Sequence, residues 1–386
     1  MKVAIVGGGP SGLYLGLLLK RGAPQWNVEV IEQNPADATF GFGVVLADTG
    51  LLQLREADEA SYQALCAATK QHEHQIIVQN ETPIDIHLPI KGGAIPRLTL
   101  LQILEQEAER AGVVVHYRQR INDLDGLVSL GLDDADVVVG ADGINSVVRQ
   151  AFSEAFGTTT SYLGNHFAWY GTAKVFEASA LVFRKYRGGH FVAHYYAYSD
   201  QMSTFVAECD DATWQRLGLG ELSDTQLQAL MEEIFAPELD GATLLDGNAK
   251  TMWRQFPVIR NRHWSHGRHV LVGDALASAH FSIGSGTRIA MNDSIALAKA
   301  LLACDGDVAA GLAGYEHRHK PSKQKLIAAS ERSYLWYEDM ARWMEAYSPE
   351  EFVYRFMTRT GRVDDARLQR EYPELMVRLG RAGSMA

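Results

Sequence analysis

The stretch that decides the fold runs from Val3 to Gly12 and reads VAIVGGGPSG. Its first four residues are apolar and rich in β-branched side chains, which is typical of a short buried strand. Leu13 to Leu19 then continue with helical character. The sequence therefore predicts a strand, a tight glycine-rich turn and a helix.

Three glycines of this turn fill the positions of a dinucleotide fingerprint. Gly7 permits the turn, Gly9 lets a pyrophosphate approach the backbone, and Gly12 packs the helix against the strand. The N-terminus of the helix would then face the phosphates with unpaired N–H groups and a positive dipole. A purely structural turn is the alternative for such a pattern taken alone.

Glu32 strengthens the interpretation as a nucleotide site. Residues 28–31 predict a second strand, and Glu32 follows Gly12 by about 20 residues. At that spacing an acidic side chain can accept hydrogen bonds from both ribose hydroxyls. The alternative is an ordinary exposed glutamate at the end of a strand.

Composition limits the class of protein. The chain has 386 residues, 47% hydrophobic and 22% charged, which predicts one large core or two closely joined domains. A formal charge of −11 argues against a nucleic-acid surface, although it does not exclude a local pocket for an anionic molecule. No apolar run reaches the roughly 20 residues of a membrane span. We expect a soluble protein with neither a nucleic-acid nor a membrane partner.

The cysteines and the N-terminus predict a cytoplasmic protein. Cys66, Cys209 and Cys304 are widely spaced and odd in number, which predicts neither a disulfide framework nor a metal site. The chain starts directly with the strand and turn, without the longer apolar stretch of a secretory signal.

A second strand-turn pattern occupies residues 136–143. A buried parallel strand is predicted up to Ala141, and Asp142 and Gly143 form the turn that follows. An Asp-Gly pair after a strand is also a common turn signal without any functional role.

A third strand-turn-helix pattern starts at Val270. Gly273 and Asp274 follow the strand, and Gly284 and Gly286 precede the next helix. Three such motifs in this order resemble the flavoprotein hydroxylases of the p-hydroxybenzoate hydroxylase type.

The resemblance implies the roles of these residues. FAD would be bound without a covalent bond, with Asp142 and Gly143 near its pyrophosphate and the route of the nicotinamide donor. Asp274 would bind the ribityl chain, and the helix after Gly286 would point its N-terminus at the flavin ring. Arg97 would also reach the FAD, and a surface arginine on an amphipathic helix is the alternative.

Three strings narrow the resemblance. Residues 40–46, 169–172 and 280–287 look like the salicylyl-CoA 5-hydroxylase and 2-aminobenzoyl-CoA monooxygenase group and the indole hydroxylase of violacein biosynthesis. The first string resembles the loop that lets the flavin ring move. The chain departs from the broader family at two places. It has Leu276-Ala277 where that family has Ala-His, and His280-Phe281 where that family has two prolines. We place Phe281 among the substrate contacts.

The segment from about residue 160 to 260 predicts strands of a mixed sheet. In the resembling family such a sheet covers the flavin and supplies the substrate pocket. His194, Tyr196 and Tyr198 share one face by the two-residue period, so we expect them to contact an aromatic substrate. A partly solvated face is the alternative.

The resemblance implies a single-component monooxygenase that hydroxylates an electron-rich aromatic or heteroaromatic ring. NADH or NADPH would reduce FAD, and dioxygen would form a flavin hydroperoxide. The substrate would be a phenol, aniline, hydroxypyridine or indole, as a free acid or a CoA thioester. His280 is the candidate for orienting or deprotonating it, because an ordinary imidazole pKa of about 6.5 suits a general base. A packing role for His280 is the alternative.

Rival functions on the same scaffold are a reductase, an oxidase or a halogenase, and a non-catalytic flavin-binding regulator. The Trp-x-Trp-x-Ile-Pro string of the halogenases is absent.

We expect an α/β fold, in which a Rossmann-like FAD-binding domain is interwoven with a mixed β-sheet substrate domain. The first would comprise residues 1–75, 95–160 and 262–330, and the second residues 76–94 and 161–261. Residues 331–386 would form a C-terminal helical segment, whose aromatic side chains we assign to core packing. A homodimer is compatible with the family resemblance.

Overall fold

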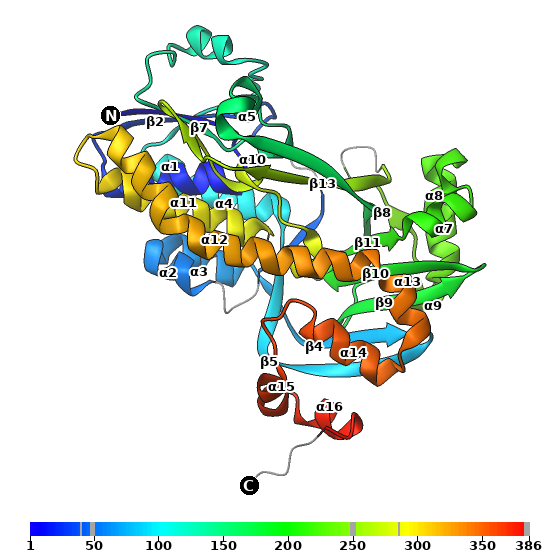
Figure 1. Ribbon diagram of the computed structural model, residues 1–386. Helices are drawn as coiled ribbons and strands as arrows, with labels where there is room; N and C mark the ends of the chain where they lie inside the picture. Colours follow the sequence, from blue (N-terminus) through cyan, green and yellow to red (C-terminus); the bar gives the residue numbers. More distant parts are fainter. Residues whose placement is uncertain (39–40, 47–50, 248–251, 285, 382–386) are drawn as a thin grey trace.

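The computed structural model describes residues 1–38, 41–46, 51–247, 252–284 and 286–381. It has two sheets, each with its own layer of helices, and long elements that run between them (Figure 1). The α/β class predicted from the sequence is confirmed.

The first sheet is mainly parallel and has the strand order β14-β15-β7-β1-β2-β6. Its strands are β1 (Lys2–Val6), β2 (Asn27–Ile31), β6 (Val114–His116), β7 (Val137–Gly140), β14 (Ser265–His266) and β15 (His269–Leu271). Only β14 is antiparallel to its neighbour. The three strands expected before the glycine-rich, Asp-Gly and Gly-Asp turns, β1, β7 and β15, lie side by side. Their carboxyl ends therefore meet at one edge, which is where open parallel sheets bind ligands.

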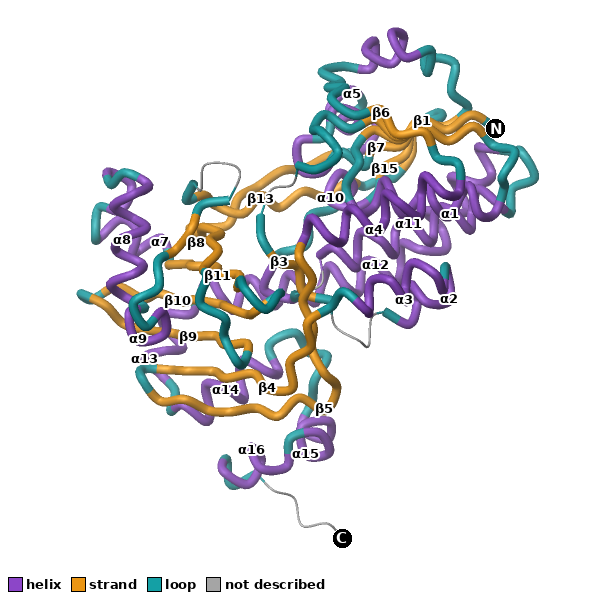
Figure 2. The backbone as a smooth tube through the Cα atoms, turned by 180° about the vertical axis from the view of Figure 1, so that it is seen from behind, coloured by secondary structure: helices purple, strands orange, loops and turns teal. Residues whose placement is uncertain are grey.

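Helices cover this sheet because its strands are apolar on both faces, as in other parallel sheets. Val137, Val138 and Val139 have no exposed surface. The helix α1 (Pro10–Gly22) packs between α4 (Arg97–Ala111) and α11 (Gly286–Leu302) (Figure 2). The shorter helices of this part are α2 (Leu52–Ala57), α3 (Glu59–Ala67), α5 (Val147–Ala151), α6 (Ser153–Phe156) and α10 (Gly273–Leu276), with 3-10 turns at Leu124–Leu130, Gly143–Asn145 and Phe281–Ile283.

The second sheet is mostly antiparallel and has the order β12-β8-β11-β10-β9-β4-β5-β3, with β13 also paired to β8. Its strands are β3 (Gly43–Val45), β4 (Lys70–Gln79), β5 (Thr82–Pro96), β8 (Thr158–Thr172), β9 (Ser179–Tyr186), β10 (Gly189–Ala197), β11 (Ser203–Cys209), β12 (Leu244–Leu245) and β13 (Arg254–Asn261). β5 ends at Pro96 and α4 starts at Arg97, so one continuous segment links the second sheet to the helices of the first.

The remaining helices lie around the second sheet. They are α7 (Asp211–Arg216), α8 (Asp224–Ile234), α9 (Ala236–Leu239), α13 (Met340–Ala346), α14 (Pro349–Thr358), α15 (Asp365–Glu371) and α16 (Pro373–Arg378), with a 3-10 turn at Leu219–Glu221. The long helix α12 (Val308–Glu338) runs from the first sheet's helices to the second sheet (Figure 1).

The aromatic side chains near the C-terminus pack as the sequence predicted. Trp336, Tyr337, Met340 and Met344 share a hydrophobic core with Phe183 of β9. Among the described residues, no helix is both long and apolar enough to cross a bilayer.

Candidate functional site

A cavity of about 800 Å³ lies between the two sheets. The residues predicted for the cofactor that line it are Gly9, Arg97, Gly143, Asp274, Gly284 and Gly286. His194, Tyr196 and Phe281, predicted for the substrate, line the same cavity. Tertiary structure thus brings most of the predicted site residues to one space.

The glycine-rich turn is shaped by close backbone contacts. Gly7 has φ +107°, and a Cβ atom there would lie 2.4 Å from the carbonyl oxygen of Ala141. A Cβ on Gly12 would lie 2.0 Å from the carbonyl oxygen of Gly7. At Gly9, by contrast, no atom of the chain lies within 4 Å of a Cβ position. Gly7 and Gly12 therefore close the turn, while Gly9 leaves open space beside the cavity for a phosphate.

The carboxylate of Glu32 holds this turn. Its Oε2 accepts a hydrogen bond of 2.8 Å from the amide of Gly8, and its Oε1 accepts from the amide and the side chain of Asn34. Glu32 does not belong to the described lining of the cavity, although Gly9 does. In this structure it connects the end of β2 to the turn.

Removing this carboxylate tests its role. We expect Glu32→Ala to weaken FAD binding by about 1 to 3 kcal/mol, because it removes the ribose acceptor and the hydrogen bond to Gly8. Titration of the apoprotein with FAD measures the effect. Glu29→Gln, on the same strand, is the matched control, since Glu29 pairs with His116 away from the turn. An unchanged FAD affinity in Glu32→Ala would contradict the fingerprint interpretation.

Asp142 lies beside the glycine-rich turn, at the end of β7. Its Oδ2 accepts a hydrogen bond of 2.7 Å from the amide of Val147. Its Oδ1 is buried and has no hydrogen-bond partner among the described residues. Burial raises the pKa of this carboxyl, and hydrogen bonds from its own turn oppose the shift. Asp142 is not in the described lining of the large cavity, although its neighbours Ala141 and Gly143 are.

Arg149 links the turn at Asp142-Gly143 to the turn at Gly273-Asp274 by hydrogen bonds. Its guanidinium donates to the carbonyl oxygens of Gly143 and Ile144 and to that of Ala275, at 3.2 Å. The two turns are far apart in the sequence, and Arg149 fixes their separation at the cavity wall.

Asp274 exposes its side chain to the cavity and is otherwise surrounded by protein. Burial raises its pKa, while the charges of Lys323 and Arg97 oppose the shift. Arg97 lies on the opposite wall, at the start of α4, where burial lowers its pKa and the charges of Asp274 and Glu32 oppose that shift. An acceptor and a cation therefore face the same space.

Two helix N-termini also face the cavity. Gly9 is the N-cap of α1, and Gly286 starts α11. The first residues of both helices line the cavity, so unpaired N–H groups and two positive helix ends point into it. Such ends favour anions such as a pyrophosphate or a reduced flavin ring.

These groups fit FAD. The open space at Gly9 and the two helix N-termini suit a phosphate, and the exposed carboxylate of Asp274 can accept hydrogen bonds from the hydroxyls of a polyol chain. The segment expected to move with the flavin contains the short strand β3, whose Val44 and Val45 line the cavity. Phe40 and Ser285 of the quoted strings lie outside the described residues.

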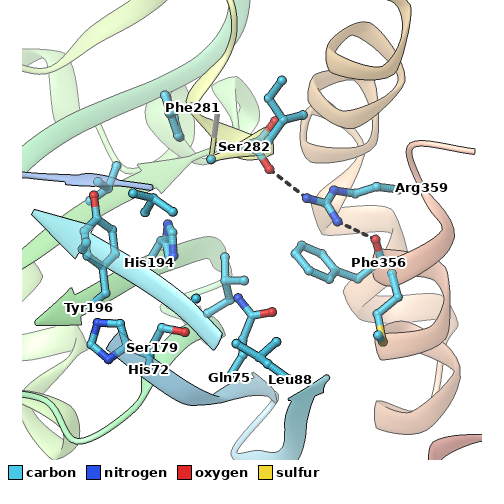
Figure 3. A pocket seen from close by; sticks show the side chains of 18 of the residues that line it. His72, Gln75, Leu88, Ser179, His194, Tyr196, Phe281, Ser282, Phe356 and Arg359 are labelled. Carbon is cyan, nitrogen blue, oxygen red and sulfur yellow. Dashed lines mark hydrogen bonds between the residues drawn. The ribbon is translucent and has the colours of Figure 1, made fainter. Parts of the chain in front are cut away.

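A second cavity of about 320 Å³ adjoins the first (Figure 3). The two share wall residues, namely Val45, His194, Tyr196, Val206, Phe281 and Gly284. The smaller cavity extends from this shared wall between the second sheet and the C-terminal helices, where Arg359 lies opposite His194 and Tyr196 (Figure 3).

The predicted substrate face is only partly assembled. His194 and Tyr196 line both cavities, but Tyr198 belongs to the described lining of neither. β10 ends at Ala197, and the Tyr198 ring lies where a Cβ on Gly43 would be, 2.5 Å from its Cδ1. Tyr198 therefore packs against Gly43 of β3, and its contact with the substrate stays a prediction.

His194 and Tyr196 present neutral groups. Burial lowers the pKa of His194 to about 4, with a smaller effect from the charge of Arg359. The hydroxyl of Tyr196 donates to the carbonyl oxygen of Gly43 at 3.0 Å, which leaves its ring to face a ligand.

His280 is packed in the protein. It is 3% exposed, and it is not among the described residues that line either cavity. Its Nδ1 accepts a hydrogen bond from the amide of Ser282, and its ring centroid lies 4.0 Å from that of Phe281. Burial lowers its pKa to about 3. The general-base role assumed an ordinary imidazole pKa, so the structure favours the packing alternative.

A packing role makes a measurable difference. We expect His280→Asn, whose side chain can still accept from Ser282, to retain FAD and most of the turnover, because no proton transfer depends on the ring. The pH profile of kcat/KM should be the same in this variant as in the wild-type protein around pH 6.5, where an ordinary imidazole would titrate. Loss of turnover by 100-fold or more with FAD still bound would instead indicate a catalytic base.

The polar residues of the smaller cavity that were not predicted as site residues include His72, Glu208 and Arg359. Glu208 lies in β11, and its burial to 3% exposed surface has no signal in the sequence. Arg359 follows α14, in the C-terminal helical segment. No pattern of period or spacing links these residues.

Comparison with known proteins places the chain among flavoproteins. Residues 1–330 match the family model described as FAD binding domain. The chain is 36% identical over 369 residues to salicyloyl-CoA 5-hydroxylase from a Streptomyces species, covering 93% of this chain and 70% of that enzyme. It is 33% identical to protodeoxyviolaceinate monooxygenase from Chromobacterium violaceum, covering 93% and 94%.

Solved structures agree on the fold. The tetrameric form of 2-methyl-3-hydroxypyridine-5-carboxylic acid oxygenase matches with a TM-score of 0.71 at 17% identity, covering 95% of each chain. The mixed α/β arrangement with its two sheets is thus a known one.

Proposed function

The chain belongs to the FAD binding domain family and is an FAD-dependent aromatic monooxygenase. From this premise we propose which ligand each of its two cavities binds. The large cavity holds FAD, and the small cavity holds the ring to be hydroxylated. The substrate is an electron-rich phenol, aniline, hydroxypyridine or indole, and NADH or NADPH is the reductant.

One observation carries this proposal: the two cavities share a wall. Gly284 lies just before α11, at the end of the large cavity where the resemblance puts the flavin ring, and it also lines the small cavity. Phe281, His194 and Tyr196 belong to both linings as well. A ring bound in the small cavity would therefore lie against the reactive end of the cofactor.

The protein's own residues would bind FAD and stabilise the charge on its ring. Gly9, Asp142, Arg97 and Asp274 would hold the phosphates and the ribityl chain of FAD, and the N-terminus of α11 would stabilise negative charge on its ring. When bound, FAD supplies hydride uptake from the nicotinamide and activation of dioxygen.

The wall that the two cavities share is apolar with a few neutral polar groups. Val206, Phe281 and the ring of Tyr196 exclude water from the shared wall, and neutral His194 can orient a hydroxyl or amino group on the substrate. A dry, neutral wall suits the transfer of an electrophilic oxygen to a ring.

The discontinuous domain division expected from the sequence is part of this proposal. The separate hydrophobic cores of the two sheets support it. We further propose a cytoplasmic location, which the absence of a disulfide among the three cysteines supports. The homodimer remains a prediction.

Turnover with isotopic oxygen tests the function. NADH and NADPH oxidation is measured against phenolic, anthranilic, pyridine and indole acids, free and as CoA thioesters. We expect one class to stimulate oxidation and to yield a product that carries one atom of ¹⁸O from ¹⁸O₂. Stimulated oxidation that yields only hydrogen peroxide with every compound would contradict hydroxylation and favour an oxidase or a reductase.

A further inference from the structure

Arg359 is a partly buried cation that lines the small cavity, and it has no carboxylate partner among the described residues. Among the described residues, no carboxylate lies within salt-bridge distance of Arg359, whereas Arg367 at the same cavity pairs with Glu371 at 2.8 Å. Buried charges in proteins are usually paired, because leaving water costs them several kcal/mol. A carboxylate supplied by a ligand would therefore be stabilised by Arg359.

Hydrogen bonds hold the Arg359 guanidinium in place without neutralising it. Its Nη2 donates to the carbonyl oxygen of Ser282 at 2.7 Å and its Nη1 to that of Phe356 at 2.6 Å (Figure 3). Its Nε donates to the hydroxyl of Ser333 at 3.0 Å, and the group lies 3.8 Å from the centroid of the Phe356 ring. These contacts use three of the five N–H donors of a guanidinium and leave two for a ligand.

The other titratable groups of the cavity do not balance this charge at neutral pH. His194 is neutral, since burial lowers its pKa to about 4, and burial also lowers the pKa of His72. Burial raises the pKa of Glu208 to about 8, the charge of Glu338 adds to the shift, and Asn165 opposes it through a 2.7 Å hydrogen bond. Burial likewise keeps Tyr337 protonated by raising its pKa.

At neutral pH the cavity wall thus carries one net positive charge, on Arg359, because the charges of Arg367 and Glu371 cancel each other. A ligand with a single negative charge would neutralise it, and a planar carboxylate matches a guanidinium in geometry. A cavity of about 320 Å³ is of the size that receives a small aromatic molecule.

We propose that Arg359 binds the carboxylate of a free aromatic acid, and that this contact directs the ring toward Phe281 and the cofactor cavity. This inference rests on the proposed function for the identity of the ring as substrate. It adds the charge of the substrate, its orientation and the residue that selects it.

Binding to the FAD-loaded protein tests the anion site without turnover. The probes are 2-hydroxybenzoate, 2-aminobenzoate and indole-2-carboxylate, each compared with its primary amide, which has nearly the same shape and no charge. The change in the visible spectrum of FAD gives each Kd at pH 7. We expect at least one acid to bind 10-fold or more tightly than its amide in the wild-type protein.

Variants of two arginines show which residue causes the preference for an acid over its amide. Arg359→Met should weaken binding of the acid by 10-fold to 100-fold and bring the ratio of acid to amide close to one, while Arg359→Lys should keep part of the preference through its charge. Arg367→Gln is the matched control, because it removes a cation of the same cavity that already has a carboxylate partner. FAD content and thermal midpoint show whether each variant is folded.

The ionisation of Glu208 gives a second test of the carboxylate site, through the pH dependence of acid binding. The charged and titratable groups near it are Tyr337 and Glu338 of α12, with His194 of β10, His72 of β4 and Arg359 at the same cavity. When pH rises through 8, Glu208 gains a negative charge that opposes the bound carboxylate, so the Kd of the acid should rise in the wild-type protein. Glu208→Gln should remove this rise. Benzoates do not titrate in that range.

Three results would overturn the carboxylate site. They are equal binding of acid and amide to the wild-type protein, a preference that survives in folded Arg359→Met, and failure of every acid to bind at millimolar concentration while a CoA thioester binds. Failure of the proposed function is distinguishable, since acids would then bind with the expected preference but yield no product labelled with ¹⁸O.

Discussion

Replacing Lys323 by methionine should lower the free energy of unfolding by about 3 to 5 kcal/mol. Lys323 and Asp293 form an ion pair whose side chains are 1% and 0% exposed. Burial alone would raise the pKa of Asp293, but Lys323 and His319 hold it below its usual range. Removing the cation would leave a buried carboxylate with only His319 to oppose its charge.

The effect should extend to the cofactor. Oδ2 of Asp293 accepts a hydrogen bond of 2.9 Å from the amide of Gly273, the residue before Asp274. A protonated or displaced Asp293 would loosen this turn, so the Lys323→Met variant should also bind FAD more weakly.

Urea unfolding of the FAD-free and FAD-loaded protein measures both effects. Lys320→Met, on the same helix, is the matched control, because Lys320 forms a partly exposed pair with Glu316 and should contribute 1 kcal/mol or less. Adding Asp293→Asn to Lys323→Met should recover part of the loss, since it removes the stranded charge. A Lys323→Met protein within about 1 kcal/mol of the wild type would contradict the buried-pair argument.

The second large effect is expected at Gly12. Gly12→Ala would put a methyl group 2.0 Å from the carbonyl oxygen of Gly7, which belongs to the backbone and cannot rotate away. α1 would have to move from the turn, at a cost of about 3 kcal/mol or more. Because the N-terminus of α1 lines the cavity proposed for FAD, we expect FAD affinity to fall by about 100-fold or more.

Gly9→Ala separates packing from binding. No atom of the chain lies within 4 Å of a Cβ on Gly9, and its φ of −72° suits alanine. This variant should unfold at the wild-type temperature in the absence of FAD and yet bind FAD more weakly, because the methyl group would occupy space meant for the phosphate. If both variants bind FAD as the wild type does, the turn is not the pyrophosphate site.

The cofactor half of the site could be predicted because its determinants are local. The turn at Gly7 to Gly12 needs glycine for reasons within a single strand-turn-helix unit, and Glu32 follows in the next strand. Asp142 and Asp274 each follow a parallel strand directly, and parallel strands of one sheet place their carboxyl ends at the same edge. These local patterns can be read in the sequence because they do not depend on contacts with distant parts of the chain.

The substrate half could be predicted only in part. The period of two residues correctly placed His194 and Tyr196 on one face, and both line the shared wall. It could not show that β10 ends before Tyr198, nor that His280 is enclosed by aromatic rings. Period fixes the direction of a side chain from its own strand, whereas what covers that side chain comes from elsewhere in the chain.

By itself, then, the sequence determined the α/β class, the cofactor and the conformation of the three turns, because glycine conformation, strand period and short spacings act between neighbouring residues. Only the tertiary structure decided the charge of the substrate cavity. Arg359, Glu208 and His194 come from three separate elements, and whether each is charged depends on how completely the others and the C-terminal helices remove it from water.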